Sequence, residues 1–189
     1  MTANQYRRAT LVEYPQIVRL NAANFIGNLA EEERRDGFLS AIFTPQQVAA
    51  MAADLGITVA LDGDAVAGFV CAFRNDFDHG SPVVAKMIAS YGDVKFDHRP
   101  LTSYSTYAYG PVCIDRAYRG KGVLRGLFEA QKQDLAGQFD VGVALIARNN
   151  PHSMQAHVAG LGMTEVGEFE VNGNVYATVA FRLPAINKL

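Results

Sequence analysis

The sequence predicts a single α/β domain in which helices flank a mixed sheet. Strand-like runs alternate along the chain with apolar patterns of helical period. Asp62-Gly63-Asp64 and Asn172-Gly173 each stand between two strand-like runs, as hairpin turns do. The chain has 189 residues, of which 49% are hydrophobic and 19% charged, a size and composition typical of one globular domain. It contains no internal repeat, low-complexity tract or interior linker.

The first third of the chain is expected to form a strand and two helices. YRRAT predicts the strand, and residues 12–24 predict a helix with Pro15 in its first turn. The second helix lies between the N-cap residue Thr44 and Gly56. Gln47, three residues after Thr44, completes a capping-box pattern that marks the start of this helix.

Residues 57–73 predict a hairpin, and the segment that follows breaks the alternation of elements. Residues 74–103 contain one short helical pattern between two loops. The segment is too long for a hairpin turn between its flanking strands, so we expect an inserted cap there.

The second half is expected to give a strand, a helix, a strand, a helix and a final hairpin. The first of these strands, STYAYGPVCID, contains Gly110-Pro111. Proline donates no ladder hydrogen bond and glycine loosens the pleat, so this pair predicts a bulge or an edge. The backbone groups of residues 112–114 would then be available to another partner.

The helix that starts near Lys121 carries charges of the wrong sign at its beginning. The macrodipole favours anions there, and each misplaced cation costs about 0.3–1 kcal/mol at an exposed site. Interior glycines weaken a helix by about 0.5–1 kcal/mol each against alanine. An anion bound by the first-turn N–H groups would offset these costs, and the alternative is a solvated basic loop whose glycines serve only for turning. The residues concerned are Arg116, Arg119, Lys121 and Arg125, with Gly120, Gly122 and Gly126.

Two common phosphate-binding motifs do not fit this helix start. A Walker loop requires Gly-Lys-Ser/Thr, whereas Val123 follows Gly122 and offers magnesium no hydroxyl. The dinucleotide fingerprint requires G-x-G-x-x-G and an acidic residue ending the next strand. This chain has G-x-G-x-x-x-G, and its next strand ends in Ala147-Arg148-Asn149.

The segment instead resembles the GNAT superfamily of acyl-CoA-dependent N-acyltransferases. Residues 119–124, RGKGVL, resemble the family's Gln/Arg-x-x-Gly-x-Gly/Ala motif, with Leu124 departing from the usual small residue. Asn150 at the end of the next strand and Leu161-Gly162-Met163 after the following helix match a second motif. The resemblance covers about residues 107–170. It implies a mostly antiparallel central sheet, splayed between its fourth and fifth strands.

The resemblance also implies acetyl-CoA as co-substrate and a set of residues that bind it. Backbone groups of residues 112–114 would pair with the pantetheine arm, and amides of residues 119–125 would surround the pyrophosphate. Asn150 would hold the end of the pantetheine. The coenzyme-binding residues predicted in this way are Val112, Cys113, Ile114, Arg119, Gly120, Lys121, Gly122, Val123, Leu124, Arg125, Asn150 and Ser153.

His157 is the candidate general acid. Members of the family carry a tyrosine seven residues after the motif asparagine, where it protonates the departing CoA thiolate, and this chain has His157 there. An imidazole with a pKa near its ordinary value of about 6.5 can do the same work. However, Gly162 comes one residue later than usual, and a histidine on the helix face with no chemical part is the alternative.

The acceptor side is predicted less directly. Tyr107 and Tyr109 alternate along one strand and could line the acceptor pocket, with aromatic core packing as the alternative. Asp76, Asp78 and His79 form an acidic cluster that could meet a cationic amine, with a solvated loop as the alternative. The strand amides near Val112 could stabilise the oxyanion of the transition state. No general base is identifiable.

Composition limits the other partners. The net charge of −2 and the pI of about 6.1 give no overall basic field for nucleic acid. The uncharged stretches are too short for a membrane span, and Cys71 and Cys113 are expected to be buried, reduced thiols in the cytoplasm. His152 and His157 are poorly spaced for a shared ligand, so no metal site is expected. The oligomeric state stays open, although the resemblance makes a homodimer unsurprising.

Three functions follow as hypotheses. The first is an N-acetyltransferase that moves an acetyl group directly from acetyl-CoA to a primary amine. The second is a sensor of the same fold that binds acyl-CoA without turnover, which the missing tyrosine and Leu124 keep open. The third is a nucleotide-dependent oxidoreductase or kinase that uses the basic helix start. Both failed phosphate motifs speak against this third hypothesis.

Overall fold

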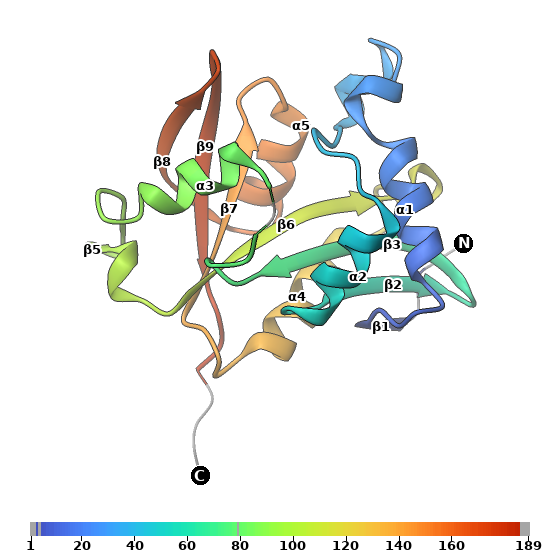
Figure 1. The fold of residues 1–189 in the computed structure, drawn as a ribbon, viewed down its shortest axis with the longest axis horizontal. Coiled ribbons are helices and arrows are strands. Elements are labelled where there is room, and N and C mark those ends of the chain that lie inside the picture. The colour runs from blue at the N-terminus through green and yellow to red at the C-terminus, as the bar shows by residue number, and fades with distance from the viewer. Residues whose placement is uncertain (1–2, 4, 79, 186–189) are drawn as a thin grey trace. The chain divides into compact units, whose positions relative to one another are not determined.

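The computed structural model describes residues 3, 5–78 and 80–185 (Figure 1). Seven strands form a mixed sheet in the order β1-β2-β3-β6-β7-β9-β8. The β6–β7 pair is parallel, whereas β1–β2, β2–β3, β7–β9 and β8–β9 are antiparallel. The chain divides into two compact units, Met1–Phe73 with Tyr109–Asp134 and Arg74–Ala108 with Leu135–Leu189.

The described residues of the first unit form three helices of more than one turn, short 3₁₀ helices and four strands. Strand β6 enters it from Tyr109 onwards, and helix α4 belongs to it up to Asp134. Its elements are β1 (Gln5–Arg8), α1 (Tyr14–Ala23), η1 (Ile26–Asn28), η2 (Glu33–Asp36), α2 (Pro45–Ala53), β2 (Ile57–Asp62), β3 (Ala65–Phe73), β6 (Thr106–Ile114), η4 (Arg116–Tyr118) and α4 (Val123–Leu135).

Local sequence explains where α2 and the first hairpin begin and end. The Thr44 hydroxyl accepts from the Gln47 N–H at 3.2 Å, and the Gln47 side chain accepts from the Thr44 N–H at 2.9 Å. The predicted capping box is thus confirmed. Gly56 follows the helix with a φ of 101°, a conformation that favours glycine. The β2–β3 turn falls at Gly63-Asp64, as predicted.

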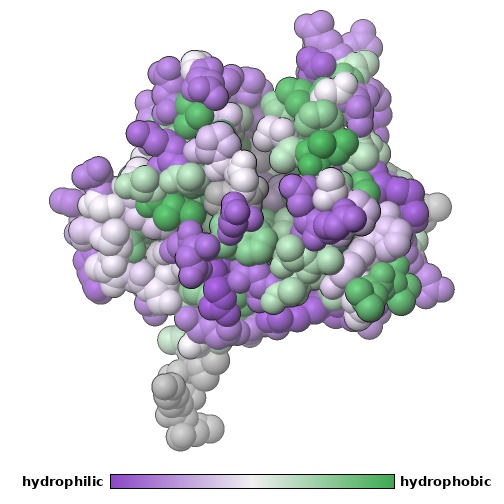
Figure 2. All heavy atoms as spheres, in the orientation of Figure 1, coloured by the Kyte–Doolittle hydropathy of each residue, from purple (hydrophilic) through white to green (hydrophobic). Residues whose placement is uncertain are grey.

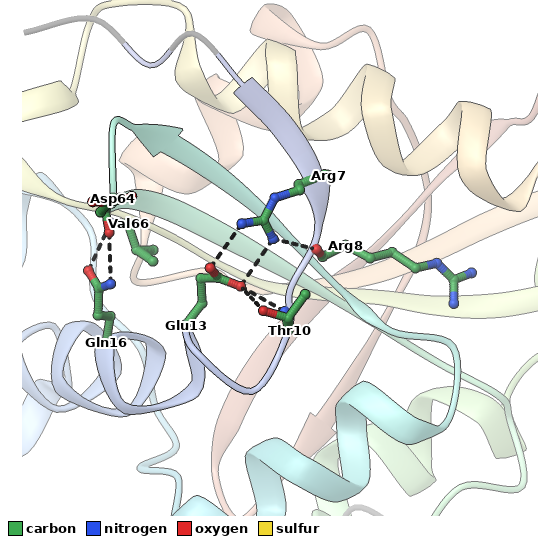
Figure 3. Close-up of polar contacts among 7 residues, drawn as sticks. All are labelled: Arg7, Arg8, Thr10, Glu13, Gln16, Asp64 and Val66. Carbon is green, nitrogen blue, oxygen red and sulfur yellow. Dashed lines mark hydrogen bonds and ion pairs between the residues drawn. The ribbon is translucent and has the colours of Figure 1, made fainter.

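An ion pair joins β1 to the start of α1 (Figure 3). Both terminal nitrogens of Arg7 donate to the Glu13 carboxylate, at 2.9 and 3.0 Å. The same carboxylate accepts from the N–H and the hydroxyl of Thr10, at 2.7 and 2.9 Å. Arg7 lowers the pKa of the buried Glu13 from 4.5 to about 2. Gln16, in the first turn of α1, donates to the Asp64 carbonyl oxygen and accepts from the Val66 N–H in the β2–β3 hairpin.

Helix α4 lies against β1 through a close contact at Gly126. A Cβ atom added at Gly126 would come within 2.2 Å of the Tyr6 ring. The glycine therefore allows the helix backbone to approach the ring directly. The helix buries Val123, Leu127 and Phe128 on one face, at the helical spacing that the sequence predicted.

The second unit is built around β7, β9 and β8, with residues 106–108 of β6 at its side. The ladder between β6 and β7 pairs Thr106–Ala108 with Val141–Val143. Its other elements are α3 (Pro82–Ala89), β4 (Lys95–Phe96), β5 (Arg99–Pro100), η3 (Leu101–Ser103), β7 (Val141–Ala147), α5 (Pro151–Met154), the π-helical η5 (Gln155–Gly160), β8 (Thr164–Val171) and β9 (Asn174–Arg182).

The segment expected as an insertion, residues 74–103, carries α3, the two-stranded β4–β5 sheet and η3. Arg182 of β9 anchors it by donating to Asp97 at 2.7 Å, and its guanidinium lies over the rings of Phe96 and Tyr104. This segment is therefore folded against the sheet of its own unit. Its role as a cap stays a prediction.

Most of the face drawn in Figure 2 is hydrophilic, and apolar side chains gather there in small separate patches. Within the described part of the chain, the exposed large apolar side chains are Leu11, Val12, Ile42 and Val175. Among the described helices, none combines the length and the apolar character that a membrane span needs.

Candidate functional site

The predicted coenzyme-binding residues divide between the two units. Residues 112–114 and 119–125 belong to the first unit, at the end of β6, in the loop after η4 and at the start of α4. Asn150 and Ser153 belong to the second unit, at the start of α5.

Strand β6 ends in a tightly packed segment. Gly110 interrupts its regular geometry with a φ of 104°. Further along, an added Cβ at Gly68 of β3 would lie 2.8 Å from the Cys113 carbonyl oxygen, so the two backbones are in close contact. The Cys113 thiol is buried and donates to the Leu20 carbonyl oxygen at 3.7 Å. Burial raises the pKa of this thiol to about 12, which makes it a poor nucleophile at neutral pH.

The turn after β6 is fixed by Asp115 and Tyr118. The Asp115 carboxylate accepts from the Ala117 N–H at 2.8 Å and so caps η4. The hydroxyl of the buried Tyr118 donates to Asp62 of β2 at 2.9 Å. These contacts hold the chain in place just before the glycine-rich loop.

The loop itself presents a row of backbone amides. Gly120 and Gly122 have φ values of 70° and 79°, and an added Cβ at either would meet no atom within 4 Å. Successive N–H groups in such a turn and at a helix start form a concave site for anions. For the part of the chain that the structure describes, no hydrogen bond of 3.5 Å or less to a protein acceptor is found for the N–H groups of Gly120, Lys121, Gly122, Val123 and Leu124.

The cations of this region have partners within the protein, which the sequence argument did not foresee. Arg116 pairs with Glu33 at 2.9 Å, and the Lys121 ammonium donates to the Ala117 carbonyl oxygen at 2.5 Å. Arg119 makes three hydrogen bonds with protein oxygens. Glu33 thus compensates the charge of Arg116, whereas the oxygens that Arg119 contacts are neutral, and an anionic ligand for Arg119 stays a prediction. Gly126 likewise serves helix packing, and the observation that points to an anion is the row of amides.

In the second unit, Asn150 caps α5. Its side-chain oxygen accepts from the Ser153 N–H at 3.1 Å, and its own N–H donates to the Ala147 carbonyl oxygen at 2.9 Å. Pro151 occupies the first helical turn, where its missing N–H costs nothing. The pattern Asn-Pro-x-Ser thus fixes the helix start directly after β7.

His157 lies on the π-helical turn η5 and is 8% exposed. Its Nδ1 is 2.9 Å from the Ser153 carbonyl oxygen, which can only accept a hydrogen bond. Nδ1 therefore carries the proton in the neutral ring, and Nε2 carries the lone pair. Burial lowers the pKa of His157 below its ordinary 6.5, against an opposing effect of the Ser153 carbonyl. The π-helical turn accommodates one residue more than an α-helical turn, which accounts for the late position of Gly162.

The predicted acceptor-side residues differ in burial. Tyr107 is 0% exposed between Phe139 and Phe181, with ring centroids 5.3 and 6.2 Å away. Tyr109 is also buried and meets Phe128 edge-on at 5.9 Å. The interpretation of these tyrosines as pocket-lining residues is replaced by its alternative, aromatic core packing. Asp76 is exposed in the loop before α3, and His79 lies outside the described residues.

Three contacts of the site were missed by the sequence reasoning. Asn24 and Asp36 both bond Arg119, and Asp62 bonds Tyr118. Each pair is far apart along the chain, and no motif connects its members. Among the described residues, no group of three or more His, Cys, Asp or Glu side chains is arranged to hold a metal ion.

No protein-family model matches this chain, and no curated protein matches it by sequence. Solved structures do match. An N-acetyltransferase from Staphylococcus aureus is 17% identical with a TM-score of 0.63, over 95% of this chain and 98% of that one. A ribosomal-protein-alanine N-acetyltransferase from Brucella melitensis is 16% identical with a TM-score of 0.62, over 95% of this chain and 100% of that one.

A third match holds a ligand. It is a Salmonella typhimurium protein assigned as an acetyltransferase and solved with its cofactor acetyl-CoA. It is 16% identical with a TM-score of 0.57, over 98% of this chain and 97% of that one. Likeness at these identities establishes the fold. The chain has the fold of N-acetyltransferase structures, and the fold class predicted from its sequence is confirmed.

Proposed function

We propose that the protein is an N-acetyltransferase that moves an acetyl group from acetyl-CoA to a primary amine by direct transfer. The observation that carries the proposal is the row of amides from Gly120 to Leu124 at the head of α4, for which the described residues provide no acceptor within 3.5 Å. The confirmed fold supports it, because the matched structures include N-acetyltransferases and one protein with acetyl-CoA bound.

In this proposal the amides donate hydrogen bonds to the pyrophosphate oxygens of the coenzyme. The positive end of the α4 dipole adds to the attraction, and the exposed Lys121 and Arg125 lie in the same loop and first turn. Val112 and Ile114 lie on β6 beyond its ladder with β7, and their backbone groups would pair with the pantetheine amides. Asn150 and Ser153 at the start of α5 would hold the pantetheine near its thiol end.

The reaction is an exchange of one acyl bond for another. The neutral amine nitrogen attacks the thioester carbonyl carbon, and the carbonyl oxygen becomes an oxyanion stabilised by an amide donor near Val112. The C–S bond then breaks, the nitrogen loses a proton, and the CoA thiolate gains one. The general-acid role proposed for His157 requires its imidazolium form, because the neutral ring already uses its proton on the Ser153 carbonyl.

Coenzyme binding is tested first by thermal unfolding. A ligand that binds only the folded state adds about 2.7 kcal/mol of stability at a hundredfold excess over its Kd. We expect acetyl-CoA and CoA to raise the Tm clearly, and NAD or ATP to leave it unchanged. A shift with NAD or ATP alone would exclude this function and favour the nucleotide-dependent alternative.

Gly122→Ala tests the loop itself. The substitution meets no atom but disfavours the φ of 79°, so the amides should turn away and acetyl-CoA affinity should fall by at least about tenfold. Gly173→Ala is the matched control, since Gly173 has a φ of 77° in the β8–β9 turn and equally open surroundings. Equal affinity in the two variants, measured by calorimetry, would remove the loop from the site.

A sensor that binds acetyl-CoA without turnover is the second candidate. The buried, neutral His157 favours it, because no imidazolium is held ready to protonate a thiolate. Release of free CoA thiol from acetyl-CoA in the presence of a panel of primary amines separates the two functions. Amine-dependent release above the rate without enzyme identifies a transferase, and coenzyme binding without such release identifies a sensor.

A further inference from the structure

Arg119 occupies the first position of the RGKGVL motif, yet its side chain faces the protein. Nε donates to the Ile114 carbonyl oxygen at 3.2 Å, Nη1 to the Asp36 carbonyl oxygen at 3.0 Å, and Nη2 to the Asn24 side-chain oxygen at 2.7 Å. These contacts join the end of β6, the last residue of η2 and the residue that caps α1. All of the partners lie in the first unit.

The partners suit a guanidinium and leave it little reason to move. Carbonyl oxygens at the end of a helix lack intrahelical donors and favour a cation, which Arg119 supplies to η2. Asn24 is 6% exposed, and its amide nitrogen donates to the Leu20 carbonyl oxygen at 2.9 Å. The Asn24 oxygen is thereby oriented toward Arg119. The planar fork of arginine serves three acceptors at once, which the single ammonium of lysine cannot do.

We propose that Arg119 is a positioning residue that holds the glycine loop in its anion-binding conformation. It directly precedes Gly120, the first residue of the glycine loop for whose N–H the described residues provide no acceptor within 3.5 Å. A loop with two glycines at positive φ has many conformations available, and fixing each residue costs conformational entropy. Anchoring its first residue to three parts of the fold removes much of that cost before a ligand arrives. The proposal rests on the proposed coenzyme site.

This role differs from a direct bond between Arg119 and a phosphate, and the two are separable. A phosphate contact depends mainly on charge, so Arg119→Lys would preserve much of the affinity and added salt would weaken binding of the wild type more than of Arg119→Ala. A positioning contact depends on the fork and on its acceptors. Arg119→Lys should then behave like Arg119→Ala, and Asn24→Ala should reproduce the loss without touching the ligand.

The experiment measures acetyl-CoA affinity by calorimetry at low and high salt. We expect Arg119→Ala, Arg119→Lys and Asn24→Ala each to weaken binding by about tenfold, with an unchanged salt dependence. The double variant of Arg119→Ala with Asn24→Ala should lose no more affinity than Arg119→Ala alone, because Arg119→Ala already removes the one contact that Asn24→Ala removes. Arg116→Gln is the matched control, since it removes a cation from the same turn while leaving Arg119 in place, and it should bind like the wild type.

Wild-type affinity in Arg119→Lys, or in Asn24→Ala, would overturn the proposal. Circular dichroism is used to check that each variant is folded. If Asn24→Ala is not folded, the affinity of Arg119→Lys alone decides between the two roles. Hydrogen exchange in the ligand-free protein gives an independent measurement. The amides of Tyr118 and Arg119, which donate to Asp115 and Arg116, should exchange faster in Arg119→Lys but not in Arg116→Gln. If no variant and no wild type binds acetyl-CoA, the proposed function fails while the exchange result still decides the positioning role.

Discussion

At the level of single residues, burial decides which form of His157 the fold accepts. The Ser153 carbonyl oxygen at 2.9 Å fixes the proton on Nδ1, and burial disfavours a second proton on the ring. Protonation therefore costs folding free energy that an exposed histidine would not lose. The sign is that of a depressed pKa: stability is full above the unfolded value of 6.5 and is lost as the pH falls below it.

His157→Gln tests this dependence. We expect the Tm of the wild type to fall more than that of the variant between pH 7.5 and pH 5.5. Only in the wild type must folding either release a proton from the side chain at position 157 or bury that side chain in its charged form. The other titrating groups are common to both proteins and cancel in the comparison. Equal losses in the two proteins would show that His157 does not resist protonation.

Single residues also show where sequence reasoning succeeds. Thr44 and Gln47 were recognised as a capping box because their partners are three residues apart. The partners of Arg119 could not be recognised, because Asn24 and Asp36 come close only when the chain is folded. The sequence therefore indicated the glycine-rich segment but not the protein groups that Arg119 contacts.

At the level of elements, the junction of β1 and α1 shows why predicted helix limits shift. The sequence predicted a helix from about residue 12, and α1 begins at Tyr14. Residues Thr10–Glu13 form a turn closed by the Glu13 carboxylate, which is held in place by Arg7 (Figure 3). Helix α4 similarly begins at Val123 rather than near Lys121, because Gly120 and Gly122 adopt positive φ.

Glu13→Gln should weaken this junction. Loss of a buried carboxylate with charge-assisted bonds to Arg7 is expected to lower the free energy of unfolding at pH 7 by about 1–3 kcal/mol. The folded pKa of about 2 lies below the ordinary 4.5, so the contribution is present above pH 4.5 and is lost as the pH falls toward 2.

Urea unfolding of both proteins at pH 7 and pH 3 measures the effect. The difference in the free energy of unfolding between wild type and Glu13→Gln should be smaller at pH 3, where Glu13 of the unfolded wild type is already protonated. Glu33→Gln serves as the control, because its ion pair with Arg116 is exposed and should matter much less. A constant difference at both pH values would assign the cost to packing instead of charge.

At the level of the whole molecule, the order of elements was predictable and their grouping was not. The order of the main strands and helices could be predicted from the hydrophobic periodicity, the Asn172-Gly173 turn and the capping patterns. Only one of the three boundaries between the compact units, after Phe73, coincides with a break in the sequence pattern, because the other two fall inside β6 and inside α4. Local patterns describe neighbours along the chain, whereas the units are defined by contacts between distant segments.

The single domain expected from the sequence predicts one cooperative unfolding transition. Neither unit is a continuous stretch of chain, and one strand and one helix each contribute to both. Near-ultraviolet circular dichroism, which reports on packed tyrosines, should therefore lose its signal at the same urea concentration as the far-ultraviolet helix signal. Two separated transitions would show instead that the units unfold independently.

The contact between Tyr6 and Gly126 constrains how the sequence can change over evolution. A ring carbon of Tyr6 fills the space that a side chain at position 126 would need. The residue type allowed at either position therefore depends on the residue at the other, although the two positions lie far apart along the chain. Related sequences should covary here: a side chain larger than hydrogen at position 126 should occur together with a smaller residue in place of the tyrosine.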